Sequence, residues 1–206
     1  MKGLLLKDYY MIKKYCRIYI FLLLLFIVIS IFAETNPFFI YYPPLIAGLI
    51  PITLISYDEK EKWDIYCTTL PYNKKQIVSE KYLIGFIFVF LVTILSAISQ
   101  GIKMINLGIF IWNDFLFLSG TILMVGLIGP SILLPFIFKL GAEKGRIAYY
   151  IIIGFLFSII TIISGNEIEL TNNLEPNFYL LIVSSISLYL ISWLISVEFY
   201  KSREIA

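Results

Sequence analysis

Residues 57–81 read YDEKEKWDIYCTTLPYNKKQIVSEK and form the longest polar segment of the chain. This segment holds ten of the thirty charged residues, and long apolar segments lie on both sides of it. A bilayer excludes such a density of charge, whereas apolar segments of about 20 residues can cross it. The polar segment is therefore predicted to lie in water between two spans.

The composition indicates that the remainder of the chain lies mostly in lipid. Apolar residues make up 60% and charged residues 15% of the sequence, and the mean hydropathy is +0.89. Soluble domains average about 45–50% apolar and about 25% charged residues. Because single strands cannot cross a bilayer, we predict an all-α integral membrane protein that forms one domain, residues 1–206.

Six apolar segments are predicted to be transmembrane helices. They are residues 18–33, 38–56, 82–100, 115–138, 147–164 and 178–197. If both termini are cytoplasmic, fifteen of the sixteen Lys and Arg residues lie on the inner side, with Lys103 outside. This distribution follows the positive-inside rule, so it predicts both the number of spans and their direction.

Residues 1–17 are predicted to form a basic amphipathic helix at the headgroup layer. Apolar positions recur at three- and four-residue spacing with lysines between them. These positions are Leu4, Leu5, Tyr9, Ile12 and Cys16. A signal peptide is a poorer interpretation because the charged region is too long and no small-residue cleavage site follows it.

Prolines interrupt two of the predicted spans. The candidate bend positions are Pro43, Pro44 and Pro51 in the second span and Pro130 and Pro135 in the fourth. Proline removes a backbone donor and clashes with the preceding turn, so these helices are predicted to bend. The pattern is compatible both with static kinked packing and with a moving hinge.

The polar segment itself predicts a helix from Glu59 to Leu70. Asp58 and Glu61 have the spacing of an N-cap with an acid three residues later, and Pro71 would end the helix. Its apolar face holds Trp63, Tyr66, Cys67 and Leu70. Asn73 and Gln76 repeat the capping pattern at the start of a helix that leads into the third span.

The charges of the predicted 59–70 helix favour a protein partner over lipid headgroups. Acidic and basic residues are mixed on its polar side, whereas contact with an anionic leaflet favours a basic face. The acids are Glu59, Glu61 and Asp64, and the bases are Lys60 and Lys62. Resting on headgroups remains the alternative.

The sequence offers no catalytic or energy-converting chemistry of its own. It has no histidine, no Walker loop and no ionisable residue near the middle of a predicted span. The spacing of Cys16 and Cys67 does not suggest a metal site. Serines within the predicted spans lack a basic partner, so a membrane-embedded enzyme is disfavoured, and no cofactor is expected in this chain.

Two stretches, MKGLLLKDYYMIKKY at residues 1–15 and YDEKEKWDIYCTTLPYNKKQIVSEKYL at 57–83, resemble permease subunits of type-2 ATP-binding-cassette exporters. The similarity is greatest to small bacterial six-span permeases associated with peptide export. It implies an elbow helix at residues 1–17 and a coupling helix between spans two and three. It also implies a second permease chain, identical or related, and cytoplasmic ATPase subunits that bind ATP and Mg²⁺.

The resemblance also assigns roles to residues. Those implied to couple to the ATPase are Asp58, Glu59, Glu61, Trp63, Asp64, Tyr66 and Leu70. External helices of the family would fall in residues 165–177. The implied function is export of a peptide or an amphipathic cargo across the bacterial plasma membrane, with lipid but no nucleic acid as a partner. A non-transporting immunity or sensing protein that binds an antimicrobial peptide is the alternative.

Overall fold

The computed structural model describes residues 2–32, 38–67, 69–145, 147, 151 and 178–202. Every regular element in these ranges is an α-helix, which confirms the all-α prediction for this part of the chain. The helices are α1 (Lys2–Tyr15), α2 (Arg17–Phe32), α3 (Phe38–Lys60), α4 (Trp63–Cys67), α5 (Lys74–Asn106), α6 (Trp112–Leu140) and α8 (Phe178–Ser202).

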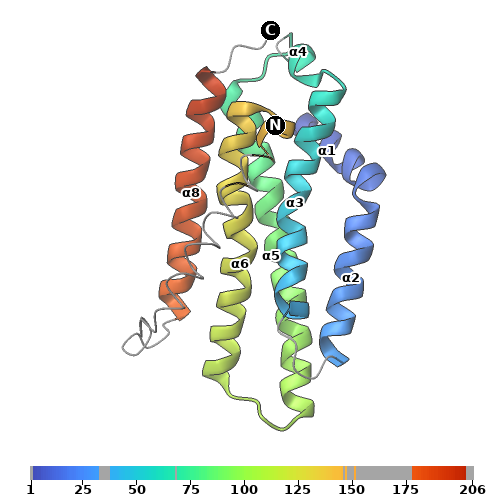
Figure 1. The fold of residues 1–206 in the computed structure, drawn as a ribbon, viewed down its shortest axis with the longest axis vertical. Coiled ribbons are helices and arrows are strands. Elements are labelled where there is room, and N and C mark those ends of the chain that lie inside the picture. The colour runs from blue at the N-terminus through green and yellow to red at the C-terminus, as the bar shows by residue number, and fades with distance from the viewer. Residues whose placement is uncertain are drawn as a thin grey trace.

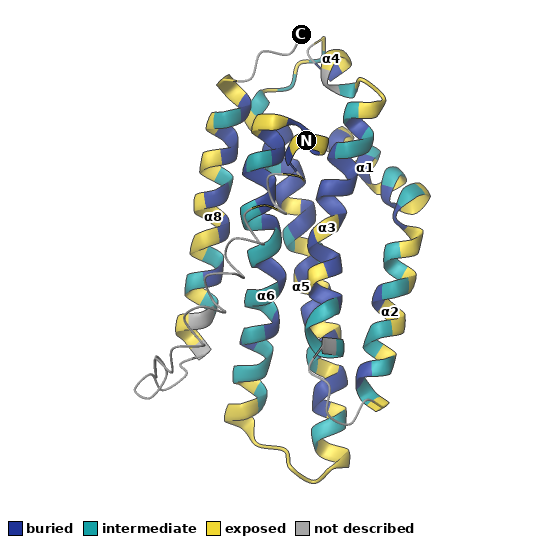
Figure 2. Ribbon diagram, viewed as in Figure 1, coloured by how far each residue is buried: buried dark blue, intermediate teal, exposed yellow. Residues whose placement is uncertain are grey.

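Five long helices run side by side along the long axis of the molecule (Figure 1). Helix α5 contacts α2, α3, α6 and α8, and α6 also contacts α3 and α8. Helices α1 and α4 lie at one end of this bundle, which is also the end where α5 starts and α8 ends (Figure 1). The most deeply buried positions lie where α3, α5 and α6 meet, and large exposed apolar side chains cover the outer faces of α2 and α8 (Figure 2).

Four of the helices are long and apolar enough to cross a membrane. They are Phe39–Lys60 of α3, all of α5, all of α6, and Ile182–Ser202 of α8. Helices α1 and α2 together form a fifth candidate that is bent by 70°. The predicted fifth span, residues 147–164, lies outside the described residues except for Ile147 and Ile151, and so does the predicted outer loop at 165–177.

The helices extend beyond the predicted spans. Helix α5 has 33 residues and continues past the predicted third span, residues 82–100, through Gly101 to Asn106. Helix α3 continues past Ser56 to Lys60. Hydropathy identifies the part of a helix that suits lipid, whereas backbone hydrogen bonds allow the same helix to continue into water. The helices are therefore longer than the predicted spans that they contain.

One turn of α1 differs from the prediction. The buried stripe of this helix and the residue after it contains Leu4, Asp8, Ile12 and Cys16, each four residues apart. Tyr9, which was predicted to belong to the apolar face, is 61% exposed. An acid thus replaces an apolar residue at one position of the buried stripe.

The prolines of α3 and α6 lie inside continuous helices, and Pro44, Pro51 and Pro130 pack against glycines of neighbouring helices. A Cβ atom added to Gly48 would lie 2.9 Å from Pro130 Cδ, and one added to Gly126 would lie 2.9 Å from Pro44 Cβ. Gly85 of α5 is close to Pro51 in the same way. These glycines allow the proline rings to fit between helix backbones, as small residues do in other membrane bundles.

Candidate functional site

The candidate site is the end of the bundle where α1 and α4 meet the end of α3 and the start of α5 (Figure 1). This region contains the polar segment that the sequence singled out. Its geometry depends on how the chain turns from α3 into α4.

The turn between α3 and α4 is set by Lys62. Its φ angle of 55° lies in the left-handed region, which side chains other than glycine seldom occupy. Helix α4 then covers only Trp63 to Cys67, so the predicted helix from Glu59 to Leu70 is wrong in its bounds. Asp58 and Glu59 are instead part of the last turn of α3. The Asp58 carboxylate pairs with Lys81 inside the bundle, so it does not cap a new helix.

The next helix begins as its sequence predicted. The backbone N–H of Asn73 donates to Gln76 Oε1 at 3.2 Å, and α5 starts at Lys74. This contact is one arm of a capping box, which satisfies a backbone donor that a helix end would otherwise leave unpaired.

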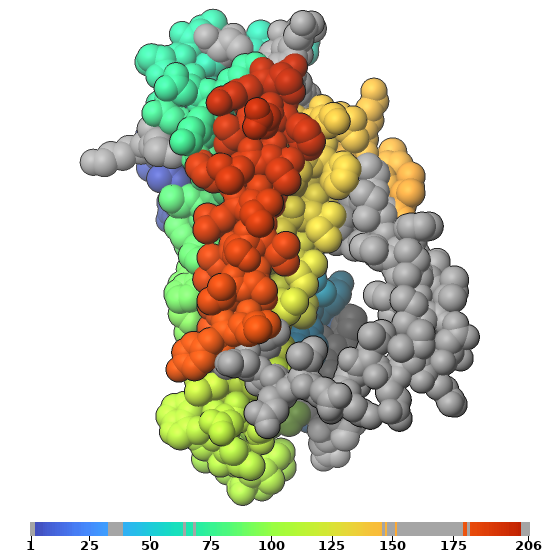
Figure 3. All heavy atoms as spheres, turned by 90° about the vertical axis from the view of Figure 1, so that its left-hand side faces the viewer, coloured from blue at the N-terminus to red at the C-terminus, as the bar shows by residue number. Residues whose placement is uncertain are grey.

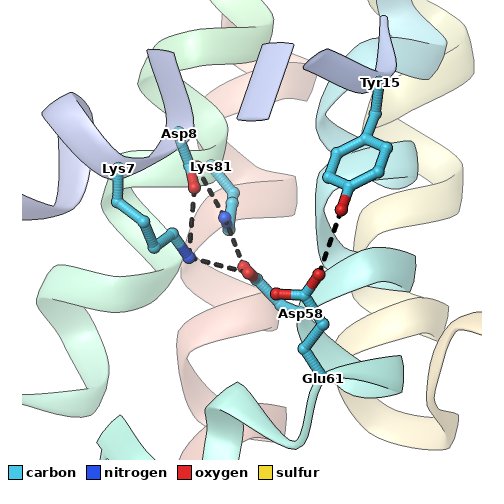
Figure 4. A network of polar contacts seen from close by, with 6 residues as sticks. All are labelled: Lys7, Asp8, Tyr15, Asp58, Glu61 and Lys81. Carbon is cyan, nitrogen blue, oxygen red and sulfur yellow. Dashed lines mark hydrogen bonds and ion pairs between the residues drawn. The ribbon is translucent and has the colours of Figure 1, made fainter. Parts of the chain in front are cut away.

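A buried ion network joins three helices at this end of the molecule (Figure 4). Lys81 Nζ of α5 lies 2.5 Å from Asp8 Oδ2 of α1 and 2.7 Å from Asp58 Oδ2 of α3. Lys7 Nζ lies 2.7 Å from Asp58 Oδ1 and 3.1 Å from Asp8 Oδ1. Asp8, Asp58 and Lys81 are all buried, so water screens these pairs little.

The ion network fixes the position of α1 against α3 and α5. Each carboxylate is ion-paired with both lysines, so two positive and two negative charges are paired in a ring. Removing one member of a buried pair leaves an uncompensated charge and typically costs about 3–5 kcal/mol. Motion at one of the three helix ends is therefore passed to the other two.

Glu80 lies beside this network and is 1% exposed. Its carboxylate oxygens accept no hydrogen bond from the described residues, and its hydrogen-bonding neighbour is another carboxylate, that of Asp8. The two lysines of the network are already matched by Asp8 and Asp58, so an ionised Glu80 would add an uncompensated buried charge. Burial of such a charge is costly enough to favour the neutral carboxylic acid.

The side chains of α4 divide into an inner and an outer group. Cys67 is buried, and the ring of Trp63 is half-buried, with Lys7 Nζ 4.3 Å from its centroid. Ile65 and Tyr66 are 49% and 59% exposed. The outward side chains of α4 that the structure describes are therefore apolar or aromatic, and Trp63 on the inner side contacts Lys7 of the network.

The predicted coupling residues are thus split between internal and outward positions. Asp58 is internal, and Glu59 Oε2 accepts from the backbone N–H of Ala142 at 2.7 Å. Glu61 is exposed and accepts from the Tyr15 hydroxyl at 3.2 Å, and Leu70 is half-buried. The side chain of Asp64 lies outside the described residues.

A cleft of about 360 Å³ opens next to Glu59, between the end of α3 and the end of α6. Ser56 and Lys60 line one side, and residues 140–144 line the other. The hydrogen bond from Ala142 to Glu59 closes its base, so α6 is tied to the same end of α3 as α4.

Sequence reasoning missed Asp8, Lys81 and Ile65 as residues of this site. Lys81 was assigned only to the basic inner side, and the apolar face of α1 was drawn through Tyr9. The detectable signal was the four-residue spacing of Leu4, Asp8 and Ile12, which places an acid on the buried stripe of an amphipathic helix.

The chemistry of this site is that of a mechanical joint. No group of three or more His, Cys, Asp or Glu residues within the described ranges is arranged to hold a metal ion. The buried charges satisfy one another, and the exposed side chains of α4 offer apolar contact area.

Comparison with known proteins assigns the chain to a family. The family model described as ABC-2 family transporter protein matches residues 3–201, which is nearly the whole chain. A comparison with curated proteins found no match. The matched range includes α1, α4, the ion network and all the candidate spans.

Proposed function

The chain belongs to the ABC-2 transporter family, and we propose on this basis that it is the membrane subunit of an ATP-driven exporter. Members of this family are permease domains and work with ABC ATPases. The match over residues 3–201 is the observation that carries the proposal. Several apolar helices of spanning length agree with a multi-pass membrane protein.

We propose that α4 is the element through which the ATPase acts. Its outward side chains, Ile65 and Tyr66, offer an apolar surface at the end of the bundle. Behind them, Trp63 packs under Lys7, which is part of the buried ion network. When the ATPases bind ATP and Mg²⁺ and close, their push on α4 would move α1, α3 and α5 together.

The proposed topology has six spans and cytoplasmic termini. Helix α1, bent by 70° from α2, would be the elbow helix at the inner membrane surface. The start of α1, helix α4 and the end of α8 lie at the same end of the bundle (Figure 1), and the basic residues favour the inner side for this end. The location would be a bacterial plasma membrane.

The proposed translocation path lies between two permease chains, identical or related. The proposed cargo is a peptide or another amphipathic molecule. Support for this cargo comes from the resemblance of residues 1–15 and 57–83 to peptide-export permeases and from the apolar, aromatic-rich composition.

Co-purification from native membranes tests the proposed function. The tagged full-length chain should retain an ABC ATPase in stoichiometric amount, detected by mass spectrometry. An immunity or sensing protein would bring down no such subunit, and that outcome would count against the exporter assignment.

A double variant tests the role of α4 separately. Ile65→Ser with Tyr66→Ala should reduce ATPase retention and ATP hydrolysis by the complex at least several-fold, because outward apolar contact area is lost. Tyr179→Ala is the matched control, since Tyr179 is 74% exposed at the opposite end of α8. Equal retention by all three proteins would show that α4 is not the docking element.

A further inference from the structure

A second feature, separate from the ion network, lies on the side of the bundle where α5 and α8 pack together. A groove of about 380 Å³ runs between these two helices. Its lining includes Tyr82, Leu83 and Phe86 of α5 and Tyr189, Leu190 and Trp193 of α8. Figure 3 faces α8, with α5 along one of its sides.

Two tyrosines form the buried side of the groove, and their polar atoms are hydrogen-bonded within the protein. The Tyr82 and Tyr189 rings lie 5.0 Å apart, and the Tyr189 hydroxyl donates to the Tyr82 carbonyl oxygen at 2.7 Å. Both tyrosines are buried, whereas Leu83 and Leu190 on the rims are 44% and 55% exposed. The groove thus presents an apolar trough to the surroundings of the bundle, with its polar atoms directed inward.

One end of the trough is basic. Lys75 is exposed, and its Nζ lies 5.2 Å from the ring centroid of Trp193. The Trp193 Nε1–H group donates to Ser79 Oγ at 3.1 Å, which bridges the two helices at this end. Because Ser79 and Trp193 also line the trough, the lysine lies next to residues of its lining.

Further cations lie close to this end. Lys74 Nζ donates to the backbone carbonyl of Lys201 at 3.1 Å, so the start of α5, which carries Lys74 and Lys75, lies against the last turn of α8, which carries Lys201. Glu198 is the acidic residue on the last two turns of α8 and is exposed. The local net charge is therefore positive. This end of the trough lies at the same end of the bundle as α4 (Figure 1).

We propose that this trough binds an anionic phospholipid. The acyl chain would lie along Leu83 and Leu190, and the headgroup phosphate would contact Lys75. A tryptophan beside a lysine at the end of an apolar groove suits the headgroup level of a bilayer. Basic pockets between spanning helices on the cytoplasmic side are suited to anionic headgroups, whereas a zwitterionic lipid gains less from the lysine.

Native mass spectrometry of the full-length protein in detergent tests this binding. The probe is an equal mixture of phosphatidylglycerol and phosphatidylcholine with the same acyl chains. The wild type should retain phosphatidylglycerol in preference to phosphatidylcholine. Lys75→Gln should lower that preference about fivefold, the factor that corresponds to one lysine near an anionic surface, and Lys75→Arg should keep it.

Two further variants separate the trough from general charge effects. Leu190→Trp should reduce retention of both lipids, because the larger side chain fills the trough from its exposed rim. Lys144→Gln removes an exposed lysine that does not line the trough and should behave as the wild type. Equal retention of the two lipids by the wild type, or equal effects of Lys75→Gln and Lys144→Gln, would overturn the proposal.

A second copy of the chain is the competing occupant. In that case Leu190→Cys would form a disulfide between two copies in native membranes, and the trough would retain no lipid. This result would also overturn the proposal. None of these measurements involves an ATPase, so they can fail while the proposed exporter function stands.

Discussion

Lys81 and Asp8 are 73 residues apart in sequence, yet Lys81 Nζ lies 2.5 Å from Asp8 Oδ2 in the interior of the protein. Asp58 accepts from the same lysine at 2.7 Å. The pairing attaches α1 to the bundle beside the helix that leads into α4. It makes the first helix of the chain part of the same rigid joint as the proposed docking element.

The first prediction concerns the loss of the central lysine. Lys81→Met should lower the free energy of unfolding in detergent by about 3–5 kcal/mol, because Asp8 and Asp58 would share only Lys7. Thermal unfolding followed by the fluorescence of the tryptophans measures this change. Lys13→Met, at an exposed position of α1, is the control and should change stability little.

A double-mutant cycle tests whether the lysine acts through its carboxylate partner. Lys81→Gln and Asp8→Asn should be non-additive, with a coupling energy of about 0.5–3 kcal/mol. Additive losses would show that the pairing contributes no stability of its own.

The second prediction concerns Glu80, which is buried and accepts no hydrogen bond from the described residues. Glu80→Gln keeps the shape of the protonated acid and carries no charge, so stability at neutral pH should stay within about 1 kcal/mol of the wild type. Asp58→Asn is the contrasting variant and should lose several times as much, because Asp58 pairs with both lysines. A large loss in Glu80→Gln would mean that an ionised Glu80 belongs to the network.

The third prediction concerns the close approach of α3 and α6. A Cβ atom at Gly48 would lie 2.9 Å from Pro130 Cδ and 3.1 Å from the backbone oxygen of Gly126. Because a backbone oxygen in a helix cannot move aside easily, Gly48→Ala should destabilise the protein by about 1–3 kcal/mol. Gly129→Ala is the matched control in α6, since no atom lies within 4 Å of its added Cβ. If both variants melted at the same temperature, the helices would not be packed as closely as described.

The fourth prediction concerns the thiol between α1 and α2. Burial, together with the negative charge of Asp8, raises the pKa of Cys16 to about 11. The thiolate is the reactive form, so in a Cys67→Ser background N-ethylmaleimide should label native Cys16 slowly at pH 7.5, and faster as the pH approaches that pKa. Unfolding in sodium dodecyl sulfate should allow complete labelling. Rapid labelling of the native protein at pH 7.5 would show that the break between the two helices is open.

Local sequence patterns predicted the elements of this protein well where one short segment contains all the information. The apolar runs identified α3, α5, α6 and α8, and the capping pattern at Asn73 and Gln76 identified the start of α5. The same kind of reasoning placed a helix at Glu59 to Leu70 and was wrong there. Asp58 has the spacing of a cap, but its carboxylate is used by Lys81, 23 residues away.

The proposed docking surface could be predicted only in part. Trp63, Tyr66 and Cys67 of α4 were recognised as apolar positions and Ile65 was missed, because periodicity cannot tell which of these residues face the bundle. The structure turns Cys67 inward and leaves Ile65 and Tyr66 outward. Which side chains face inward depends on the left-handed turn at Lys62 and on the position of α1. The spacing of residues within the segment predicts neither.

Composition alone determined that this chain is a helical membrane protein, because a bilayer requires about 20 apolar residues per span and backbone groups satisfied within each helix. The distribution of lysine and arginine indicated a direction for the spans. The tertiary structure decided which charges are buried together. Coulomb attraction acts through space, so Asp8, Asp58 and Lys81 become partners only when three separate helices bring them within hydrogen-bond distance.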